Sequence, residues 1–164
     1  MKISAQEEYG LRILLRIARD KPEDGLTIAD LSVAEGLSTS YAAKITRILR
    51  LNGFIESTRG KVGGYVLAQT PENIIINKVL KSLGGALFDQ EFCEMHTGAL
   101  KLCTNSINCS VRSLWRIIQL TLDNLLEKVT LKDLMDSEMD ASQILSRMME
   151  SQMKSLEERL APGN

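Results

Sequence analysis

Residues 27–54, TIADLSVAEGLSTSYAAKITRILRLNGF, decide the fold of this 164-residue chain. Thr27 is placed to cap a short helix and Gly36 to end it, because a threonine hydroxyl accepts an N-terminal N–H and glycine tolerates the left-handed backbone of a helix end. A second helix begins after the hydroxyl residues and ends at Asn52 and Gly53. Two short helices joined by a few residues around a glycine predict a helix-turn-helix.

The second of these helices has two chemically different faces. Its apolar side, which can pack against a core, carries Ala42, Ile45, Ile48 and Leu49. Its polar side carries Ser40, Lys44 and Arg47 at helical spacing. Such a polar face can contact DNA bases. By charge alone, a helix face that is simply exposed to solvent would have the same pattern.

The segment that follows, FIESTRGKVGGYVLA, is typical of two short β-strands around a glycine-rich turn. The strands are expected at Phe54–Thr58 and Tyr65–Ala68. Arg59 and Lys61 lie at the turn, where they can reach phosphates or a narrow minor groove. The predicted fold class is therefore mainly α with a small β-wing, a winged helix-turn-helix followed by a long dimerisation helix.

Charge patterning supports a contact with a polyanion. Residues 39–61 hold five basic residues and one acidic residue, so this stretch has a charge of +4 in a chain whose net charge is −1. One basic region on a mildly acidic chain indicates a single DNA-binding face. The candidate DNA contacts are Ser38, Thr39, Ser40, Tyr41, Lys44, Arg47, Arg59 and Lys61.

Two further helices flank this unit. EEYGLRILLRIARD, residues 7–20, has apolar residues at helical spacing, and SVRSLWRIIQLTLDNLLEKV, residues 110–129, has a longer apolar seam. The seam comprises Leu114, Ile118, Leu122, Leu125 and Val129, with Trp115 adding a large apolar side chain beside it. A seam of this kind on a protruding helix predicts a homodimer, which would present two reading helices to a palindromic operator.

We divide the chain into four parts on this basis. Residues 1–80 form the winged helix-turn-helix DNA-binding domain, 81–110 a cluster-binding loop region, 111–130 the dimerisation helix and 131–164 a methionine-rich C-terminal helical tail. No leader or membrane span is expected, which favours a cytoplasmic protein. No catalytic constellation accompanies these segments, so an enzyme is not expected.

All three cysteines of the chain lie in CEMHTGALKLCTNSINC, residues 93–109. Thiolates are the usual ligands of iron-sulfur clusters, and a short segment that carries three of them can wrap a cofactor. A zinc site of Cys3His type that uses His96 is the alternative, although the gaps lack the paired spacing of most zinc modules. A metal-free, thiol-based redox regulator and a winged-helix module that binds proteins also stay open.

The motifs together resemble a known family of bacterial regulators. YGLRILLRIA at residues 9–18, the helix-turn-helix and the wing STRGKVGGYVL at 57–67 are similar to the winged-helix iron-sulfur transcription regulators of the IscR/NsrR family. The wing pattern, Arg-Gly, two spacers and Gly-Gly-Tyr, is the most specific match. The resemblance implies a homodimeric regulator whose operator affinity responds to a 2Fe-2S or 4Fe-4S cluster that senses redox state, nitric oxide or iron.

The resemblance also implies the cluster ligands. Cys93, Cys103 and Cys109 match the three family cysteines, but Arg112 stands where IscR-like members have a histidine, and arginine does not bind metal. NsrR-like members instead use an acidic residue from the first helix of the second subunit, which corresponds to Glu8. Glu8 is therefore the expected fourth ligand, and His96 is the second candidate.

Overall fold

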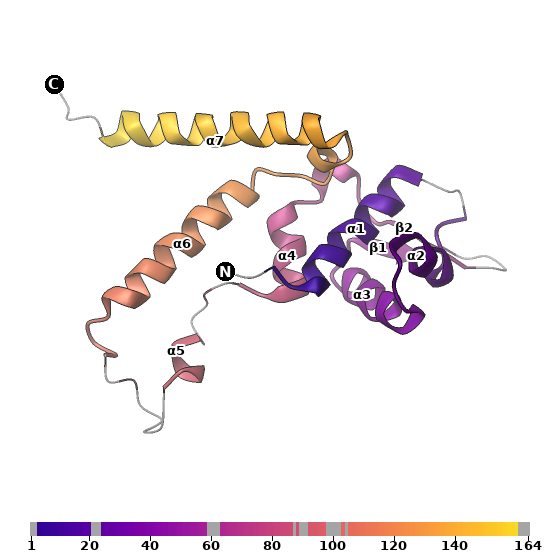
Figure 1. The fold of residues 1–164 in the computed structure, drawn as a ribbon, viewed down its shortest axis with the longest axis horizontal. Coiled ribbons are helices and arrows are strands. Elements are labelled where there is room, and N and C mark those ends of the chain that lie inside the picture. Colours follow the sequence, from indigo (N-terminus) through magenta and orange to yellow (C-terminus); the bar gives the residue numbers. More distant parts are fainter. Residues whose placement is uncertain are drawn as a thin grey trace.

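The computed structural model describes residues 3–20, 24–58, 63–86, 88, 92–97, 103 and 105–160, and it is mainly helical with one two-stranded antiparallel sheet (Figure 1). The longer helices are α1 (Ala5–Asp20), α2 (Ile28–Glu35), α3 (Thr39–Leu51), α4 (Ile76–Gly84), α6 (Ser110–Leu126) and α7 (Glu138–Leu160). The shorter elements are β1 (Ile55–Ser57), β2 (Tyr65–Leu67), α5 (Phe92–Met95) and the 3-10 helices η1 (Pro71–Asn73) and η2 (Lys132–Leu134). The predicted fold class is confirmed.

The two helices of the helix-turn-helix begin and end as predicted. At the start of α2 the Thr27 hydroxyl accepts the Asp30 N–H at 3.1 Å, while the Asp30 carboxylate accepts the Thr27 N–H at 2.9 Å. The Thr27 hydroxyl also donates to the Asp30 carboxylate at 2.7 Å, and this hydrogen bond, followed by that from the Thr27 N–H, lowers the pKa of Asp30. Gly36 ends the helix in the left-handed region at φ 65°. Ser38 caps α3 by accepting the Tyr41 N–H at 3.3 Å.

The core lies between α1, α3 and α4 and is closed on one side by the sheet. Ala42, Ile45 and Leu49 of α3 are fully buried, as predicted, and Ile48 packs at the edge of the core. On α1 the buried positions are Gly10, Ile13, Leu14, Ile17 and Ala18. Leu11 and Leu15, which belong to the same predicted helical pattern, lie at the edge of this core. Full burial of an aliphatic side chain stabilises the folded state by about 1.5 to 3 kcal/mol relative to leaving it exposed to water.

The chain returns to this core after α6. The Ile76 N–H donates to the Val129 carbonyl at 2.9 Å, and the Leu131 N–H donates to the Ile74 carbonyl at 2.8 Å. Val129 and Leu131 are buried. The sequence prediction that Val129 extends the dimer seam is therefore wrong, because its backbone pairs with the segment before α4 and α6 ends earlier, at Leu126.

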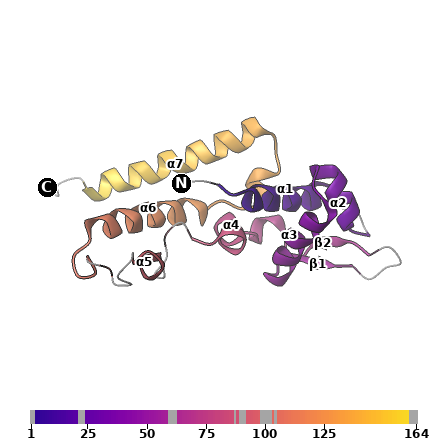
Figure 2. The ribbon, with the colours of Figure 1, turned by 60° about the horizontal axis from the view of Figure 1, so that its bottom comes forward.

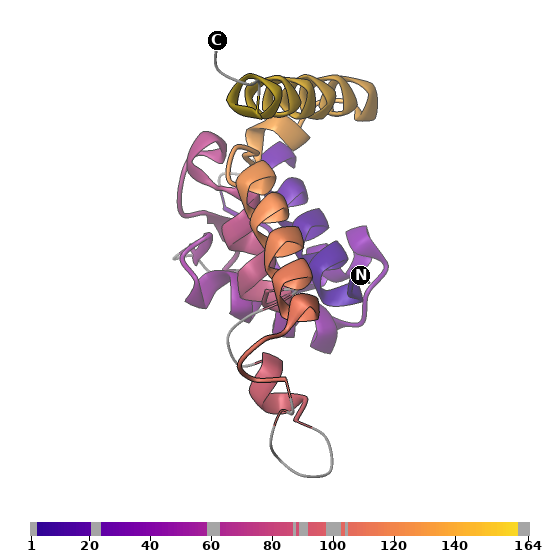
Figure 3. The same ribbon diagram turned by 90° about the vertical axis from the view of Figure 1, so that its left-hand side faces the viewer.

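The helices α6 and α7 extend away from the winged-helix unit (Figures 1 and 2). With the molecule turned by 90° about the vertical axis, α7 lies above α6 and α5 lies below it (Figure 3). Of the predicted seam only Leu114 is exposed, and Ile118, Leu122 and Leu125 are half-buried. The large apolar side chains of α6 that are more than half exposed are Val111, Leu114, Ile117 and Leu120. Trp115, expected to be buried beside the seam, is 39% exposed in the single chain. On α7, Leu145 and Met148 pack against the core, whereas Met149 and Met153 are exposed.

Arg19 at the end of α1 anchors the start of this tail. Its guanidinium donates hydrogen bonds of 2.9 to 3.1 Å to the carbonyls of Leu134, Met135 and Asp136. Among the described residues, no helix is long and apolar enough to cross a membrane.

The wing is rooted against the loop that precedes α2. β1 and β2 pair in antiparallel register, with Glu56 opposite Val66, and Leu26 forms a bridge with Tyr65. The Thr58 hydroxyl donates to the Asp24 carbonyl at 2.7 Å. Gly64 permits this close approach, since a Cβ there would lie 2.5 Å from the Asp24 carbonyl oxygen. The predicted tip residues Arg59 and Lys61 lie outside the described residues.

Gly64→Ala is expected to lower the free energy of unfolding by about 1 to 3 kcal/mol, the usual effect of overpacking, because the added methyl meets backbone that cannot rotate away. Urea unfolding followed by circular dichroism measures the change. Gly84→Ala is the matched control, since its methyl meets only the end of the Glu7 side chain, which can move aside. Equal stability of the Gly64→Ala and wild-type proteins would show that the wing root tolerates displacement.

Candidate DNA-binding face and cysteine segment

The predicted DNA contacts of the helix-turn-helix lie on α3 and its N-cap, between Ser38 and Arg47. Ser38, Thr39, Ser40, Lys44 and Arg47 are all exposed, and Tyr41 is half-buried. The Ser38 and Ser40 hydroxyls lie 3.2 Å apart, so they form one polar patch at the helix start. Hydroxyl groups at a helix N-terminus suit phosphate, and the long basic side chains one and two turns later suit base edges.

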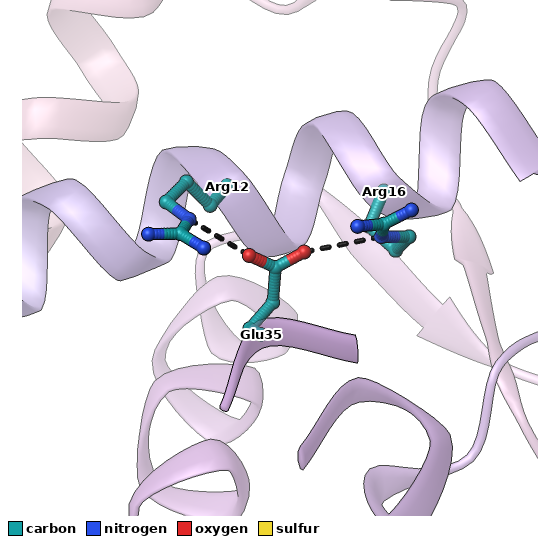
Figure 4. Close-up of polar contacts among 3 residues, drawn as sticks. All are labelled: Arg12, Arg16 and Glu35. Atoms are coloured by element: carbon teal, nitrogen blue, oxygen red, sulfur yellow. Dashed lines mark hydrogen bonds and ion pairs between the residues drawn. The ribbon is translucent and has the colours of Figure 1, made fainter. Parts of the chain in front are cut away.

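Aromatic and charged contacts from α1 position this face. The Tyr9 ring meets the Tyr41 ring edge-on with centroids 6.2 Å apart, and the Arg12 guanidinium lies 5.3 Å from the Tyr9 centroid. Arg12 and Arg16 also donate to the two carboxylate oxygens of Glu35 at 2.7 and 3.1 Å (Figure 4). One α1 surface therefore holds both the end of α2 and the first turn of α3.

Glu35 is a buried charged residue of this unit that sequence reasoning missed. Its side chain is only 4% exposed, and its two carboxylate oxygens accept the hydrogen bonds from the two arginines. The signal was present as two arginines one turn apart in α1 and an acidic residue directly before the helix-ending Gly36. Spacing within the sequence does not, however, say which helices face one another.

The three cysteines lie in α5, in the loop that follows it and at the start of α6. Cys93 lies in α5, Cys103 lies in the loop and Cys109 is the N-cap of α6. Each is half-buried and none forms a disulfide. In the described part of a single chain, no three Cys, His, Asp or Glu side chains lie close enough together to hold a metal ion.

The Cys109 thiol is held at the start of α6 by a hydrogen bond. Its sulfur accepts the Arg112 N–H at 3.3 Å, and the Arg112 guanidinium donates to the Ser106 carbonyl at 2.7 Å. Arg112 thus holds the cysteine loop against α6, a role compatible with its inability to ligate.

His96 is exposed and stacks on the Phe92 ring at a centroid distance of 4.1 Å. Its Nδ1 lies 2.8 Å from the Phe92 carbonyl oxygen and must donate to it, because a carbonyl only accepts. The Nε2 atom of a neutral ring is then the one left for a ligand. His96 therefore retains the chemistry of the second candidate ligand.

Glu8 is exposed near the start of α1. It lies on the rim of a groove of about 550 Å³ between α1, α4 and α6. Apolar side chains of all three helices line this groove, among them Leu11, Leu80, Leu122 and Leu126. Glu8 is therefore accessible to a second chain, and in the described part of its own chain it belongs to no group of three potential metal ligands.

Comparisons with known proteins agree with this geometry. A family model described as "Rrf2: Iron-dependent Transcriptional regulator" matches residues 3–137. The chain is 33% identical over 135 residues to protein rrf2 of Nitratidesulfovibrio vulgaris, covering 82% of this chain and 87% of the relative. It is 27% identical over 137 residues to the HTH-type transcriptional regulator IscR of Pectobacterium carotovorum, covering 84% and 80%.

A solved structure extends the agreement to the fold. The chain is similar to CymR, described as the global cysteine regulator of B. subtilis, with a TM-score of 0.65 and 27% identity. The likeness covers 82% of this chain and 96% of CymR. The reading helix, the wing strands and α6 all lie within the residues that the family model matches.

Proposed function

The chain belongs to the Rrf2 family of transcriptional regulators, and from this membership we propose that it is a homodimer whose operator affinity depends on an iron-sulfur cluster. Cys93, Cys103 and Cys109 of one subunit, with Glu8 of the second subunit, are the proposed ligands of a 2Fe-2S or 4Fe-4S cluster. The operator is double-stranded DNA with palindromic half-sites. The signal would be redox state, nitric oxide or iron availability.

The observation that carries the proposal is the position of the thiols. All three lie on one segment between the winged-helix unit and α6, and none is consumed by a disulfide. Three soft thiolates fit the chemistry of an iron-sulfur cluster, and one harder carboxylate makes the fourth position easier to displace. The "iron-dependent" description of the matching family supports iron in particular.

The exposed apolar face of α6 supports a dimer. Val111, Leu114, Ile117 and Leu120 are between 53% and 63% exposed in the single chain, which is unusual for so many large apolar residues on one helix. A second copy of α6 would cover them. Two-fold symmetry then separates the two copies of α3 by about one turn of DNA, roughly 34 Å, or by a multiple of that distance.

The residues of this chain suggest how such a dimer works. A cluster, when bound, supplies an iron centre whose ligands change with redox state or nitric oxide. Glu8 lies one residue before Tyr9, which contacts Tyr41 at the start of α3. A displaced Glu8 would therefore shift the α1 surface that positions the reading helix, and hydrogen bonds to bases tolerate little shift.

Metal-free thiol control is the second candidate, favoured by the likeness to a cysteine regulator and by three unlinked, half-buried thiols. One experiment separates the two. The protein is purified without oxygen, its absorption spectrum, iron and acid-labile sulfide are measured, and operator affinity is compared before and after cluster removal at fixed salt. A brown protein whose affinity changes supports the cluster, a zinc-containing colourless one supports the zinc site, and a metal-free colourless one supports thiol control.

Arg47→Ala is expected to weaken operator binding by roughly 5- to 150-fold, the equivalent of one lost base contact of about 1 to 3 kcal/mol. A duplex enriched from a randomised pool by the wild-type protein serves as the operator, and fluorescence anisotropy gives the affinity. Arg147→Ala removes the same charge from the exposed face of α7 and should change affinity less than about two-fold. Equal losses for both variants would indicate that Arg47 acts only through net charge.

A further inference from the structure

A series of hydrogen bonds through α6 joins Phe88, which lies just before the cysteine segment (residues 93–109), to α4 of the winged-helix unit. The Phe88 N–H, in the link between α4 and α5, donates to Gln119 Oε1 of α6 at 3.0 Å. Gln119 Nε2 donates in turn to Asp123 Oδ1 at 3.0 Å. Asp123 pairs with Lys81 Nζ of α4 at 2.8 Å and also accepts a hydrogen bond from the buried Asn77.

Both ends of this series of hydrogen bonds matter to the proposed function. At one end the Phe88 ring is buried and packs on the Phe92 ring at 5.3 Å, next to Cys93. At the other end, α4 lies between α6 and the helices α1 and α3 (Figures 1 and 2). A movement of Phe88 relative to α4 would stretch or break one of these hydrogen bonds, and the ring contact with Phe92 is the route by which the cysteine segment can cause it.

The two hydrogen bonds of Gln119 fix the orientation of its side-chain amide. Its amide oxygen meets an N–H and its amide nitrogen meets a carboxylate, so reversing the amide would create two repulsive contacts. Burial alone would raise the pKa of Asp123, but hydrogen bonds from Lys81, Asn77 and Gln119 and the charge of Lys81 outweigh it and lower that pKa. The carboxylate is thus held as an anion at neutral pH, which keeps the amide in one orientation.

The groove that carries Glu8 on its rim is also lined by Asn77, Lys81, Gln119 and Asp123. Glu8, the proposed ligand for the cluster of the second subunit, therefore lies in the same groove as Gln119 and Asp123, which connect to Phe88 of their own subunit. This convergence would allow both clusters of a dimer to act on the same contact between α4 and α6.

We propose that Gln119 is a positioning residue that couples the state of the cysteine segment to operator affinity, by linking Phe88 to Asp123 and Lys81. The inference rests on the proposed function, because it needs a state of the cysteines that changes DNA binding. The hydrogen bonds of Gln119 join it to Phe88 and Asp123, neither of which is a proposed ligand or DNA contact. Its removal should spare the cluster and DNA binding while uncoupling one from the other.

The test compares operator affinity with and without the cluster for the wild type and for Gln119→Met. The expected result is an unchanged absorption spectrum and iron content for Gln119→Met, with the affinity ratio between the two forms reduced from a coupling of roughly 5- to 150-fold to less than about two-fold. Gln143→Met, an equal substitution on the exposed face of α7, should retain the wild-type ratio.

Gln119→Glu is the second variant and guards against misfolding of the first. It keeps the shape and the acceptor for the Phe88 N–H but places a second carboxylate beside Asp123, so it is expected to lose the ratio as well. A wild-type ratio in either folded variant overturns the proposed role of Gln119 and leaves the proposed function intact. A ratio near one in the wild type itself would instead overturn both.

Discussion

Cys103→Ala protein purified without oxygen is expected to be colourless, with iron at background and operator affinity equal to that of the cluster-free wild type. The reason is that the chain has only three cysteines to supply thiolate ligands, and alanine removes one of them without adding another ligand. The visible spectrum, an iron and sulfide count and an anisotropy titration at fixed salt measure the three quantities.

Ser106→Ala is the control for this prediction because it alters the same loop without removing a thiol. The Ser106 contact that Arg112 uses is the backbone carbonyl, which alanine retains. The Ser106→Ala protein should keep the wild-type spectrum and affinity. A brown, iron-containing Cys103→Ala protein would contradict the ligand assignment, and a colourless, metal-free wild type would support thiol control.

Arg12→Met combined with Arg16→Met should lower the free energy of unfolding by about 3 kcal/mol, the lower end for breaking a buried ion pair. The double change leaves the Glu35 carboxylate, 4% exposed, without a countercharge. The lower end applies because the arginine side chains are 46% and 40% exposed and water already screens them. Urea unfolding measures the loss.

A third substitution, Glu35→Met, added to this double variant is expected to restore most of the lost stability, since no unpaired buried charge then remains. Arg50→Met with Arg147→Met removes the same two charges from exposed sites and should cost less than about 1 kcal/mol. Additive losses in the triple variant would show that the arginines stabilise the fold by packing and not by pairing with Glu35.

The local features of the fold could be predicted because they depend on neighbours in the sequence. Thr27 and Gly36 set the ends of α2 through contacts within three or four residues. The apolar spacing of α3 identified its buried side for the same reason. Val129 was misassigned because a heptad pattern continues past the residue where the backbone leaves the helix to pair with Ile76.

The candidate sites could be predicted only as residue types. The clustering of the cysteines was visible in the sequence, but their arrangement around a cofactor depends on a second chain in the proposed dimer. The roles of Glu35 and Gln119 could not be predicted because a lone Glu or Gln on an amphipathic helix is usually solvated. Their partners on other elements, Arg12, Arg16 and Phe88, lie 19 to 31 residues away. Polar contacts between helices become apparent only when the packing is known.

The return of Val129 and Leu131 to the winged-helix core has a consequence for synthesis on the ribosome. The domain that binds DNA is completed by residues translated after the whole excursion of the cysteine segment and α6. Because domains generally fold as units during translation, the nascent chain exposes an unfinished apolar surface until these late residues leave the exit tunnel. The cysteines therefore leave the ribosome before the winged-helix core is complete, so the proposed cluster would have its thiol ligands available before the chain can bind DNA.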